Sequence, residues 1–264
     1  MIKYITSCFL VCLALVTAAQ EKPDTVVTPS GESPISFGVD IMSRYVWRGL
    51  NLGGNAPSIQ PSLAFTFGTS KHSFQIGAWG AYSIGGSQVA QEADLFVSYS
   101  YNELLSLTLT DYFFPADDGS SPKYFDYDKD ATGHLFEATV AFNGTSSFPL
   151  SVAFSMNMYG ADAHKVNADG STGDIFMSKY LEVGYSHTLK GTDLSYFIGA
   201  ALDNPDEDLG EVAFYGNQSV GIVNMGITAE RSIEITNKFS LPLKTSFVIN
   251  PEAERVFFVF GLSF

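Results

Sequence analysis

The chain has 264 residues, of which 28 are acidic and 14 are basic, so its formal net charge is -14. A strongly acidic protein lacks the basic face that a phosphate backbone requires, and nucleic acid is therefore excluded as a partner. Beyond the N-terminal segment, no run reaches the ~18 consecutive apolar residues of a membrane-spanning helix, so a helical span is excluded too.

The first 19 residues have the pattern of a secretory signal peptide. The stretch MIKYITSCFLVCLALVTAAQ holds one lysine, an apolar run of about a dozen residues, and small residues before Gln20. We expect cleavage after Ala19, export of the chain, and a disordered periplasmic leader at 20–33. Both cysteines, Cys8 and Cys12, lie in the predicted signal, so no disulfide framework is expected.

From residue 34 to residue 264 the sequence alternates between apolar and polar residues with a period of two, which indicates β-strands. In QEADLFVSYSY, for example, Leu95, Val97 and Tyr99 alternate with Asp94 and Ser98. Twelve such segments are predicted, at 35–48, 57–68, 72–84, 91–101, 104–114, 134–143, 149–159, 176–189, 193–202, 218–235, 239–249 and 255–264.

The connections between these segments alternate in length. Short links such as TSK, NE and KGT fall on one side, and long ones at 115–133, 160–175 and 203–213 fall on the other. This asymmetry is typical of an outer-membrane barrel whose short turns are periplasmic. We therefore predict an all-β fold, a transmembrane antiparallel up-and-down β-barrel of about 12 strands in the bacterial outer membrane.

A soluble, secreted β-sandwich is the competing fold, because it shows the same alternation with the apolar face buried. Segment length favours the barrel, since a tilted membrane strand needs about 9 to 11 residues and an ordinary strand about five or six. Aromatic residues at strand ends, Tyr45 and Trp47 among them, are predicted to form interfacial girdles.

The final segment, RVFFVFGLSF, alternates aromatic residues and ends on Phe264. It resembles the terminal strands that the barrel-assembly machinery reads, so that machinery is a predicted partner, together with outer-membrane lipids and small solutes. The last strand must also pair with the first, because no open sheet edge can face lipid.

The run DIMSRYVWRGLNLGGNAPSIQPSLAF, residues 40 to 65, contains a Tyr-x-Trp-Arg-Gly element formed by Tyr45, Trp47, Arg48 and Gly49. This run resembles the opening hairpin of the TorF-type porins of the Gcw_chp family. Residues 51 to 56 depart from the Ser-Gln element of that pattern. The resemblance implies an outer-membrane location and a pore function, and it implies no substrate.

Charged residues on the polar faces are predicted to lie in the lumen. Arg44 and Arg48, four residues apart on one predicted strand, should point to the same face, with Arg255 near them across the closing strand pair. The charges could form a constriction that orients a charged solute, or a salt-bridged plug that fills a narrow lumen. The predicted constriction residues are Asp40, Arg44, Arg48, Glu92, Asp94, Glu137, Glu182 and Arg255.

The stretch FDYDKDATGHLFE, residues 125 to 137, approaches the ligand spacing of an EF-hand loop. It places Ala131 where the motif requires glycine, and its flanks are predicted strands, so an EF-hand is rejected. A solvated acidic loop is the preferred interpretation and no metal site is predicted, with Asp126, Asp128 and Asp130 as a looser candidate calcium site. The acidic loops 117–130 and 203–211 should attract cations to the pore mouth.

We also considered hydrolytic chemistry, because outer-membrane barrels include enzymes. His134 lies near Asp111 in the predicted pairing, and an Asp-His couple can activate water or a serine hydroxyl. The sequence has no G-x-S-x-G element, and a structural hydrogen bond that ties two strands together is the preferred explanation of the couple. The prediction is a non-enzymatic porin without a cofactor; a non-conducting structural or surface-binding barrel is the first alternative and an outer-membrane hydrolase the second.

Overall fold

The computed structural model describes residues 33–85, 91–115, 123–129 and 131–264. The predicted signal peptide, and all of the predicted leader except its last residue, lie outside these ranges. Within them, twelve strands form a closed antiparallel barrel, which confirms the predicted fold class. The barrel strands are β1 (Ile35–Met42), β4 (Ser58–Gly68), β5 (His72–Ser83), β6 (Gln91–Tyr101), β7 (Leu105–Phe113), β8 (His134–Phe142), β9 (Leu150–Gly160), β12 (Lys179–Leu189), β13 (Thr192–Ala201), β14 (Gly221–Thr236), β15 (Phe239–Asn250) and β16 (Arg255–Ser263).

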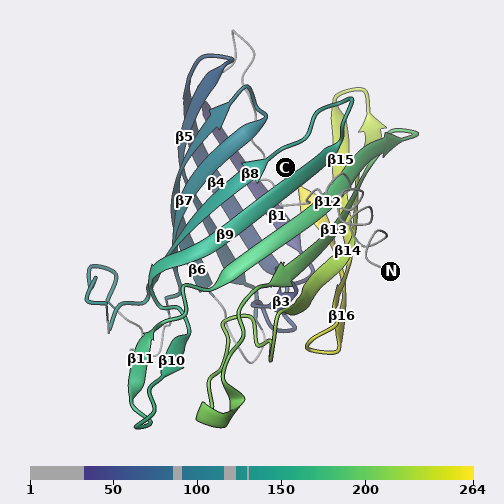
Figure 1. The fold of residues 1–264 in the computed structure, drawn as a ribbon. Helices are drawn as coiled ribbons and strands as arrows, with labels where there is room; N and C mark the ends of the chain where they lie inside the picture. Colours follow the sequence, from purple (N-terminus) through teal and green to yellow (C-terminus); the bar gives the residue numbers. More distant parts are fainter. Residues whose placement is uncertain (1–32, 86–90, 116–122, 130) are drawn as a thin grey trace, which may run out of the picture.

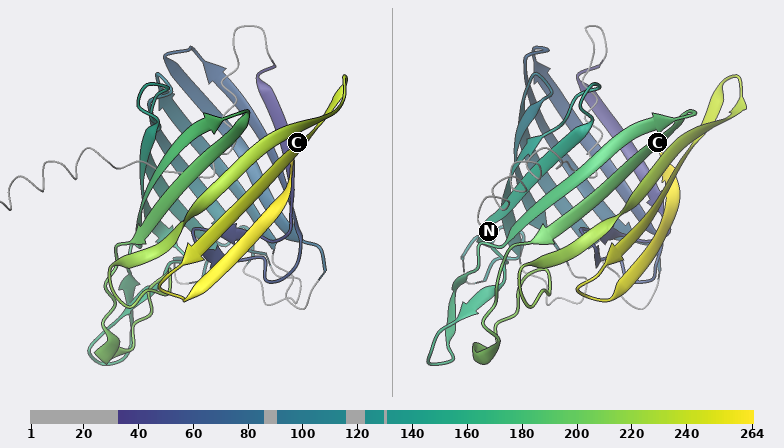
Figure 2. Two further views of the ribbon diagram at one scale, coloured as in Figure 1. Left: turned by 90° about the vertical axis from the view of Figure 1, so that its right-hand side faces the viewer. Right: turned by 45° about the vertical axis from the view of Figure 1, so that its right-hand side comes forward.

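Each barrel strand pairs with its neighbours in chain order, and the first strand closes on the last (Figures 1 and 2). In the closing pair, Asp40 lies opposite Ser263 and Met42 opposite Gly261. Backbone hydrogen bonds between Val39 and Phe264 extend this pairing by one residue. The expected pairing of the C-terminal strand with the first strand is therefore confirmed.

The connections divide the barrel into two ends. The turn end carries the links 69–71, 102–104, 143–149, 190–191 and 237–238, and the loop end carries 43–57, 84–90, 114–133, 161–178, 202–220 and 251–254. A small hairpin of β10 (His164–Val166) and β11 (Thr172–Ile175) and a 3-10 turn, η1 (Glu207–Leu209), project from the loop end, at the bottom of Figure 1. The predicted asymmetry of the connections is confirmed.

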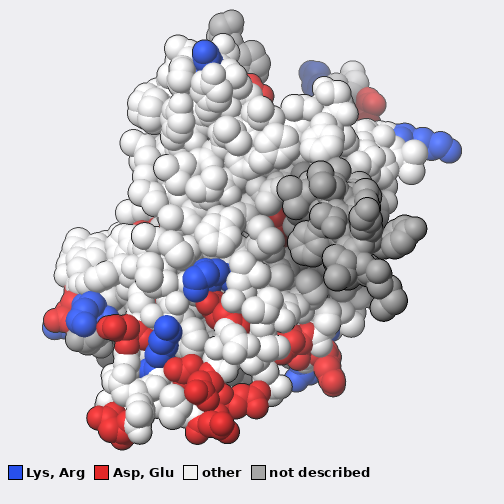
Figure 3. All heavy atoms as spheres, viewed as in Figure 1, with Lys and Arg blue, Asp and Glu red and all other residues white. Residues whose placement is uncertain are grey.

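The wall is apolar outside and polar inside, as the period of two predicts. On β7, Leu105, Leu107 and Leu109 are exposed on the outer face, while Thr108 and Thr110 line the interior. Figure 3 shows a broad face without charges over the strands, and acidic side chains gathered at the loop end. Within the described ranges, no helix is long and apolar enough to cross a membrane.

The prediction that 35–48 forms one strand is wrong. The strand β1 ends at Met42, and residues 43–57, here called the strap, leave the wall and fold into the barrel. The strap contains a hairpin of β2 (Val46–Trp47) and β3 (Leu50–Asn51). Its two-residue turn places Arg48 at a φ of 47° and Gly49 at 77°, the conformation of a primed hairpin turn. Arg44 and Arg48 therefore do not share a strand face.

Two apolar clusters hold the strap against the wall. On one side, Val46 packs against Met42, Val248, Phe257 and Val259. On the other side, Trp47 and Leu50 pack against Tyr180, Ala201, Tyr215 and Val223. Tyr45 and Trp47 thus lie inside the barrel, so their predicted place in an aromatic girdle is wrong. The contact is close at the tip, because a Cβ on Gly49 would lie 2.0 Å from the Val223 carbonyl oxygen.

Candidate functional site

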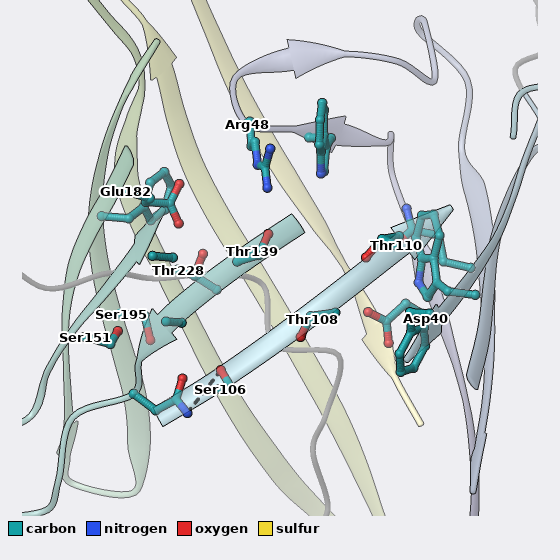
Figure 4. A pocket seen from close by; sticks show the side chains of 18 of the residues that line it. Asp40, Arg48, Ser106, Thr108, Thr110, Thr139, Ser151, Glu182, Ser195 and Thr228 are labelled. Atoms are coloured by element: carbon teal, nitrogen blue, oxygen red, sulfur yellow. Dashed lines mark hydrogen bonds between the residues drawn. The ribbon is translucent and has the colours of Figure 1, made fainter. Parts of the chain in front are cut away.

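The barrel interior contains a cavity of about 780 Å³. It begins under the strap, at Tyr45 to Gly49, and reaches Ser70 and Glu103 in the exposed links of the turn end. The cavity is therefore open toward the turn end, while the strap occupies the loop end. Figure 4 shows Arg48 on the strap hairpin above the cavity, with the hydroxyl side chains of the wall, such as Thr139 and Ser195, below it.

The walls of the cavity carry many serine and threonine hydroxyl groups. Several of these hydroxyl groups form hydrogen bonds with one another across adjacent strands. Hydrogen bonds join Ser98 to Thr108 at 2.9 Å and Thr228 to Ser246 at 2.8 Å. The same pairing joins Ser186 to Ser195 at 2.9 Å. Side chains paired in this way form a polar wall of small residues whose hydroxyl groups already have hydrogen-bond partners.

The strongest contact between strap and wall is an ion pair between Arg48 and Glu137 of β8. The guanidinium donates from Nη1 to Glu137 Oε2 at 2.5 Å and from Nη2 to Oε1 at 2.9 Å. This two-point geometry is the one in which arginine binds carboxylate best. Only 9% of the Arg48 side chain and 2% of the Glu137 side chain are exposed. We call this pair the Arg48–Glu137 lock.

The lock draws in three further parts of the barrel. Arg48 Nη2 donates to Ser155 of β9 at 2.9 Å, and Nη1 donates to the hydroxyl of Tyr215, from the 202–220 loop, at 2.7 Å. Burial raises the pKa of the Tyr215 hydroxyl well above its ordinary value, so this group stays neutral. The guanidinium also lies 4.5 Å from the ring centre of Trp47 and 4.6 Å from that of Tyr180. A buried cation with so many partners is well compensated for its lost hydration.

Glu137 is held from its own side of the wall as well. Its Oε1 accepts hydrogen bonds from Tyr112 of β7 at 3.2 Å and from Thr139 at 3.0 Å. Neither donor belongs to the strap, so the wall itself orients the carboxylate. This arrangement favours the plug, one of the two roles predicted for the lumen charges, at the level of Arg48.

The other predicted lumen residues lie at several depths. Asp40 accepts from Ser263 at 2.6 Å and lies 3.9 Å from Lys244. Glu182 accepts from the Tyr180 hydroxyl, and from Asn224 at 2.9 Å. All of the predicted residues except Arg255 line the cavity.

Arg44 and Arg255 are placed differently from the prediction. Arg44 lies on the strap, with its guanidinium 5.9 Å from the ring centre of Phe257. Arg255 is the exposed first residue of β16 at the loop end, and it is not among the residues that line the cavity. Its predicted position beside Arg44 and Arg48 required all three to lie on straight, fully paired strands, and the strap breaks that geometry.

Glu92 and Asp94 lie two residues apart on the inner face of β6. They are 3% and 5% exposed, and their carboxyl groups form a hydrogen bond with each other. Tyr45 of the strap covers them and also forms a hydrogen bond with Glu92. Trp79 of β5, directly opposite Asp94, has its ring centre 5.4 Å from that of Tyr45.

Carboxyl groups outnumber cationic groups along the cavity. Eight lining side chains are acidic and three are basic, namely Asp40, Glu92, Asp94, Glu103, Glu137, Glu182, Asp193 and Glu230 against Arg44, Arg48 and Lys244. Where these carboxyl groups are ionised, they give the lumen a negative potential that attracts cations.

His134 and Asp111 form a pair on the outer face of the wall at the loop end. His134 Nδ1 lies 2.7 Å from Asp111 Oδ1, and Nε2 lies 2.5 Å from the carbonyl oxygen of Tyr124. The imidazole is fully buried beneath the rings of Phe113 and Tyr127. Both ring nitrogens are thus occupied by a contact that ties the 123–129 segment to the wall.

Asp126 and Asp128 belong to this same segment, and Asp130 lies outside the described residues. Asp126 Oδ1 accepts the backbone N–H of Asp128 at 3.2 Å, a local turn contact. Among the described residues, no group of three or more His, Cys, Asp or Glu side chains is arranged to hold a metal ion.

Sequence reasoning missed the partners that surround Arg48. Tyr215 comes from a long loop, and Ser155 and Tyr180 are inward positions that look like any other polar or aromatic residue in an alternating strand. A signal for the strap itself was present, because Arg48-Gly49 can form a primed two-residue turn of the kind seen again at Lys190-Gly191, where φ is 51° and 75°.

Comparisons with known proteins place the chain in a family. Residues 27–215 match the model of a family described as "Bacterial protein of unknown function (Gcw_chp)". The search of curated proteins found no match. Among solved structures, the COG4313 outer membrane channel from Pseudomonas putida F1 aligns with a TM-score of 0.47 and 12% identity over 90% of this chain and 98% of that chain. Because the family match covers well over half of the sequence, this protein belongs to the Gcw_chp family.

Proposed function

We propose that this protein is an outer-membrane porin that gives small solutes passive passage, and that the strap closes its pore in the conformation described. The loop end would face the cell exterior and the turn end the periplasm, as in other barrels with this asymmetry of connections. The observation that carries the proposal is a polar cavity of about 780 Å³ inside a barrel whose outer wall is apolar.

An apolar outer wall is energetically favourable in lipid and unfavourable in water. Side chains such as Phe65, Leu107 and Val140 are exposed over the middle of the barrel, where water would make them costly. In a soluble sandwich these side chains would be the buried ones. Lipids of the outer membrane are therefore the expected surroundings of this face.

Passage requires the strap to move. Its apolar contacts and the Arg48–Glu137 lock fill the loop end, while the cavity below them stays open to the turn end. With the strap displaced, the excess of carboxyl groups over cations would favour cationic solutes. The protein would need no cofactor for this passage.

A non-conducting structural or surface-binding barrel is the second candidate function. The apolar packing of Trp47 and Leu50 against Tyr180 and Val223 favours it, because a strap packed as tightly as a protein core could be permanent. A hydrolase has less support, since His134 is fully buried and both of its ring nitrogens are engaged. We propose that the protein is not an enzyme.

The test is single-channel recording of the refolded protein in a planar bilayer with potassium chloride. Under the porin proposal, the wild type gives discrete current steps and Glu137→Gln gives more frequent or larger ones. Asp193→Asn, at the wide end of the cavity, serves as a matched control that leaves the lock intact and keeps the wild-type frequency of steps. A barrel that inserts but passes no current, even with Glu137→Gln, would refute the porin proposal and support the structural one.

A further inference from the structure

The Glu92 and Asp94 carboxyl groups lie together in a place where both cannot be charged. They project from one face of β6, each at least 95% buried, and they form a hydrogen bond with each other. A carboxylate oxygen only accepts hydrogen bonds, so this contact needs a proton. Glu92 Oε2 and Asp94 Oδ1 are buried and receive no hydrogen bond from an N–H or O–H donor among the described residues.

No charged group described around this pair takes the place of the proton by supplying a positive charge to two ionised carboxyl groups. Of the two strap arginines that line the cavity, Arg48 is engaged by Glu137 and Arg44 lies over the ring of Phe257. Asp111, on the neighbouring strand, lies near enough to Asp94 to disfavour its ionisation, and its own carboxyl group contacts His134 on the outer face of the wall. Tyr112, also on β7, carries a neutral hydroxyl that donates to Glu137. Like charges at such close range do not ionise together.

The strap lies directly on this pair. Tyr45 is 4% exposed, it forms a hydrogen bond with Glu92, and its ring packs on Trp79. The strap turns tightly there, because Gly53 N–H donates to the Tyr45 carbonyl oxygen at 3.0 Å and a Cβ on Gly53 would lie 2.9 Å from Tyr45 Cβ. Any change that drives Tyr45 from the wall therefore moves this whole end of the strap.

We propose that Glu92 and Asp94 hold one shared proton, and that the loss of this proton releases the strap at Tyr45, so that the pore opens as pH rises. Two adjacent carboxylates repel each other and require more hydration than the 3% and 5% exposure of these side chains allows while Tyr45 covers them. The direction follows: at low pH the pair is protonated and the strap stays docked, and at high pH the pair is ionised and the strap is released. This inference rests on the proposed pore function, because the strap must close a conducting path.

Two measurements on the same refolded protein test the proposal. The first is single-channel current from about pH 5 to about pH 9, a range that spans the second ionisation of a close carboxyl pair. The second is tryptophan emission over the same range. The chain has two tryptophans, Trp47 on the strap and Trp79 beneath Tyr45, so both report on strap release. We expect the open fraction to rise severalfold and the emission to shift to the red as pH increases.

The variants separate the carboxyl pair from other titrating groups. Glu92→Gln with Asp94→Asn retains the shape and a donor between the two side chains but cannot ionise, so both pH responses should vanish with the strap docked. Tyr45→Phe removes the hydroxyl that holds Glu92 and should show release at lower pH. Glu230→Gln, a carboxyl change in the same cavity away from the strap, should keep the wild-type response.

Each outcome decides a different point. An emission shift that persists in the Glu92→Gln and Asp94→Asn double variant, or that calcium chloride abolishes at constant pH, would overturn the shared-proton proposal. Current steps with no dependence on pH would overturn it as well and leave the porin function standing. An emission shift with no current at any pH would support the release of the strap and refute the porin function.

Discussion

Arg48→Lys is the most informative single substitution in the lock, because it retains the positive charge and removes the two-point geometry. Arg48 makes four hydrogen bonds, two to Glu137 and one each to Ser155 and Tyr215. A lysine ammonium can replace about one of them. If each of the three lost bonds contributes about 1 kcal/mol net, the docked strap loses about 3 kcal/mol. Complete removal of one partner of a buried ion pair costs about 3 to 5 kcal/mol, so a change that retains the charge is expected at or below the lower end of that range.

A loss of about 3 kcal/mol changes the ratio of closed to open strap by about a hundredfold. Single-channel recording at fixed pH measures this ratio as the open fraction. Arg44→Lys is the matched control, because Arg44 lies on the same strap and its recorded contact is with the ring of Phe257 rather than with Glu137. Gly49→Ala is an independent way to displace the strap, since its new Cβ would lie 2.0 Å from the Val223 carbonyl oxygen.

The four proteins to compare are the wild type, Arg48→Lys, Gly49→Ala and Arg44→Lys. Arg48→Lys and Gly49→Ala should both raise the open fraction, and Arg44→Lys should match the wild type. If Gly49→Ala opens the pore and Arg48→Lys does not, apolar packing alone holds the strap and the lock contributes nothing to closure. If neither substitution changes the open fraction, the strap is a permanent part of the barrel.

Two further predictions concern the wall and the loops. Leu109→Lys, on the outer face of β7, should lower the free energy of unfolding of the barrel by about 2 to 4 kcal/mol, measured by urea unfolding from lipid vesicles. Thr108→Lys, in the lumen, should change this free energy little. Equal effects of the two substitutions would contradict the assigned faces. At the loop end, the backbone N–H groups of Asp206 and Val166 lower the pKa of Glu211. The contact is therefore present at neutral pH and is lost as pH falls through the lowered pKa. The protection factor of the Val166 amide, which is its exchange relative to an unstructured peptide at the same pH, should fall in acid. Glu211→Gln should show the low protection factor already at neutral pH.

The barrel itself was readable from sequence because lipid imposes one rule on every strand. Each strand must be long, must place an apolar side chain outward at every second position, and must pair on both edges. For this reason the predicted segments at 91–101 and 104–114 agree with β6 and β7 to within one residue. Polar lumen positions such as Glu92, Asp94 and Glu137 follow from the same alternation.

The strap was not readable by this rule, because its sequence continues the alternation of β1. In SRYVWRG, Tyr45 and Trp47 still stand two residues apart between Arg44 and Arg48, although the chain has left the wall after Ser43. The period of two describes any extended segment with one apolar side, and a strap between two surfaces has such a side too. What separates the two cases is the positive φ at Arg48 and Gly49, which turns the chain back.

The contacts of Arg48 were beyond prediction for a further reason. On the closed wall, β8 is five strands from β1 in one direction and seven in the other, so no register of adjacent strands brings Glu137 to the strap. Only the inward fold of the strap allows Arg48 to cross the lumen. Tyr215 comes from the 202–220 loop, whose conformation no sequence periodicity specifies.

Under the proposed pore function, the charges of the lumen would serve different purposes at different depths. At the level of the strap, Glu137 is paired with Arg48, and Glu92 shares its contact with Asp94, so these groups hold the closed state. Toward the turn end, Glu103 and Asp193 are exposed in the open part of the cavity, where no strap contact constrains them. Hydrated carboxylates of this kind set a potential and bind weakly, which suits selection of passing ions. In the proposed pore, closure and ion preference would therefore depend on separate residues, and a substitution could change one without loss of the other.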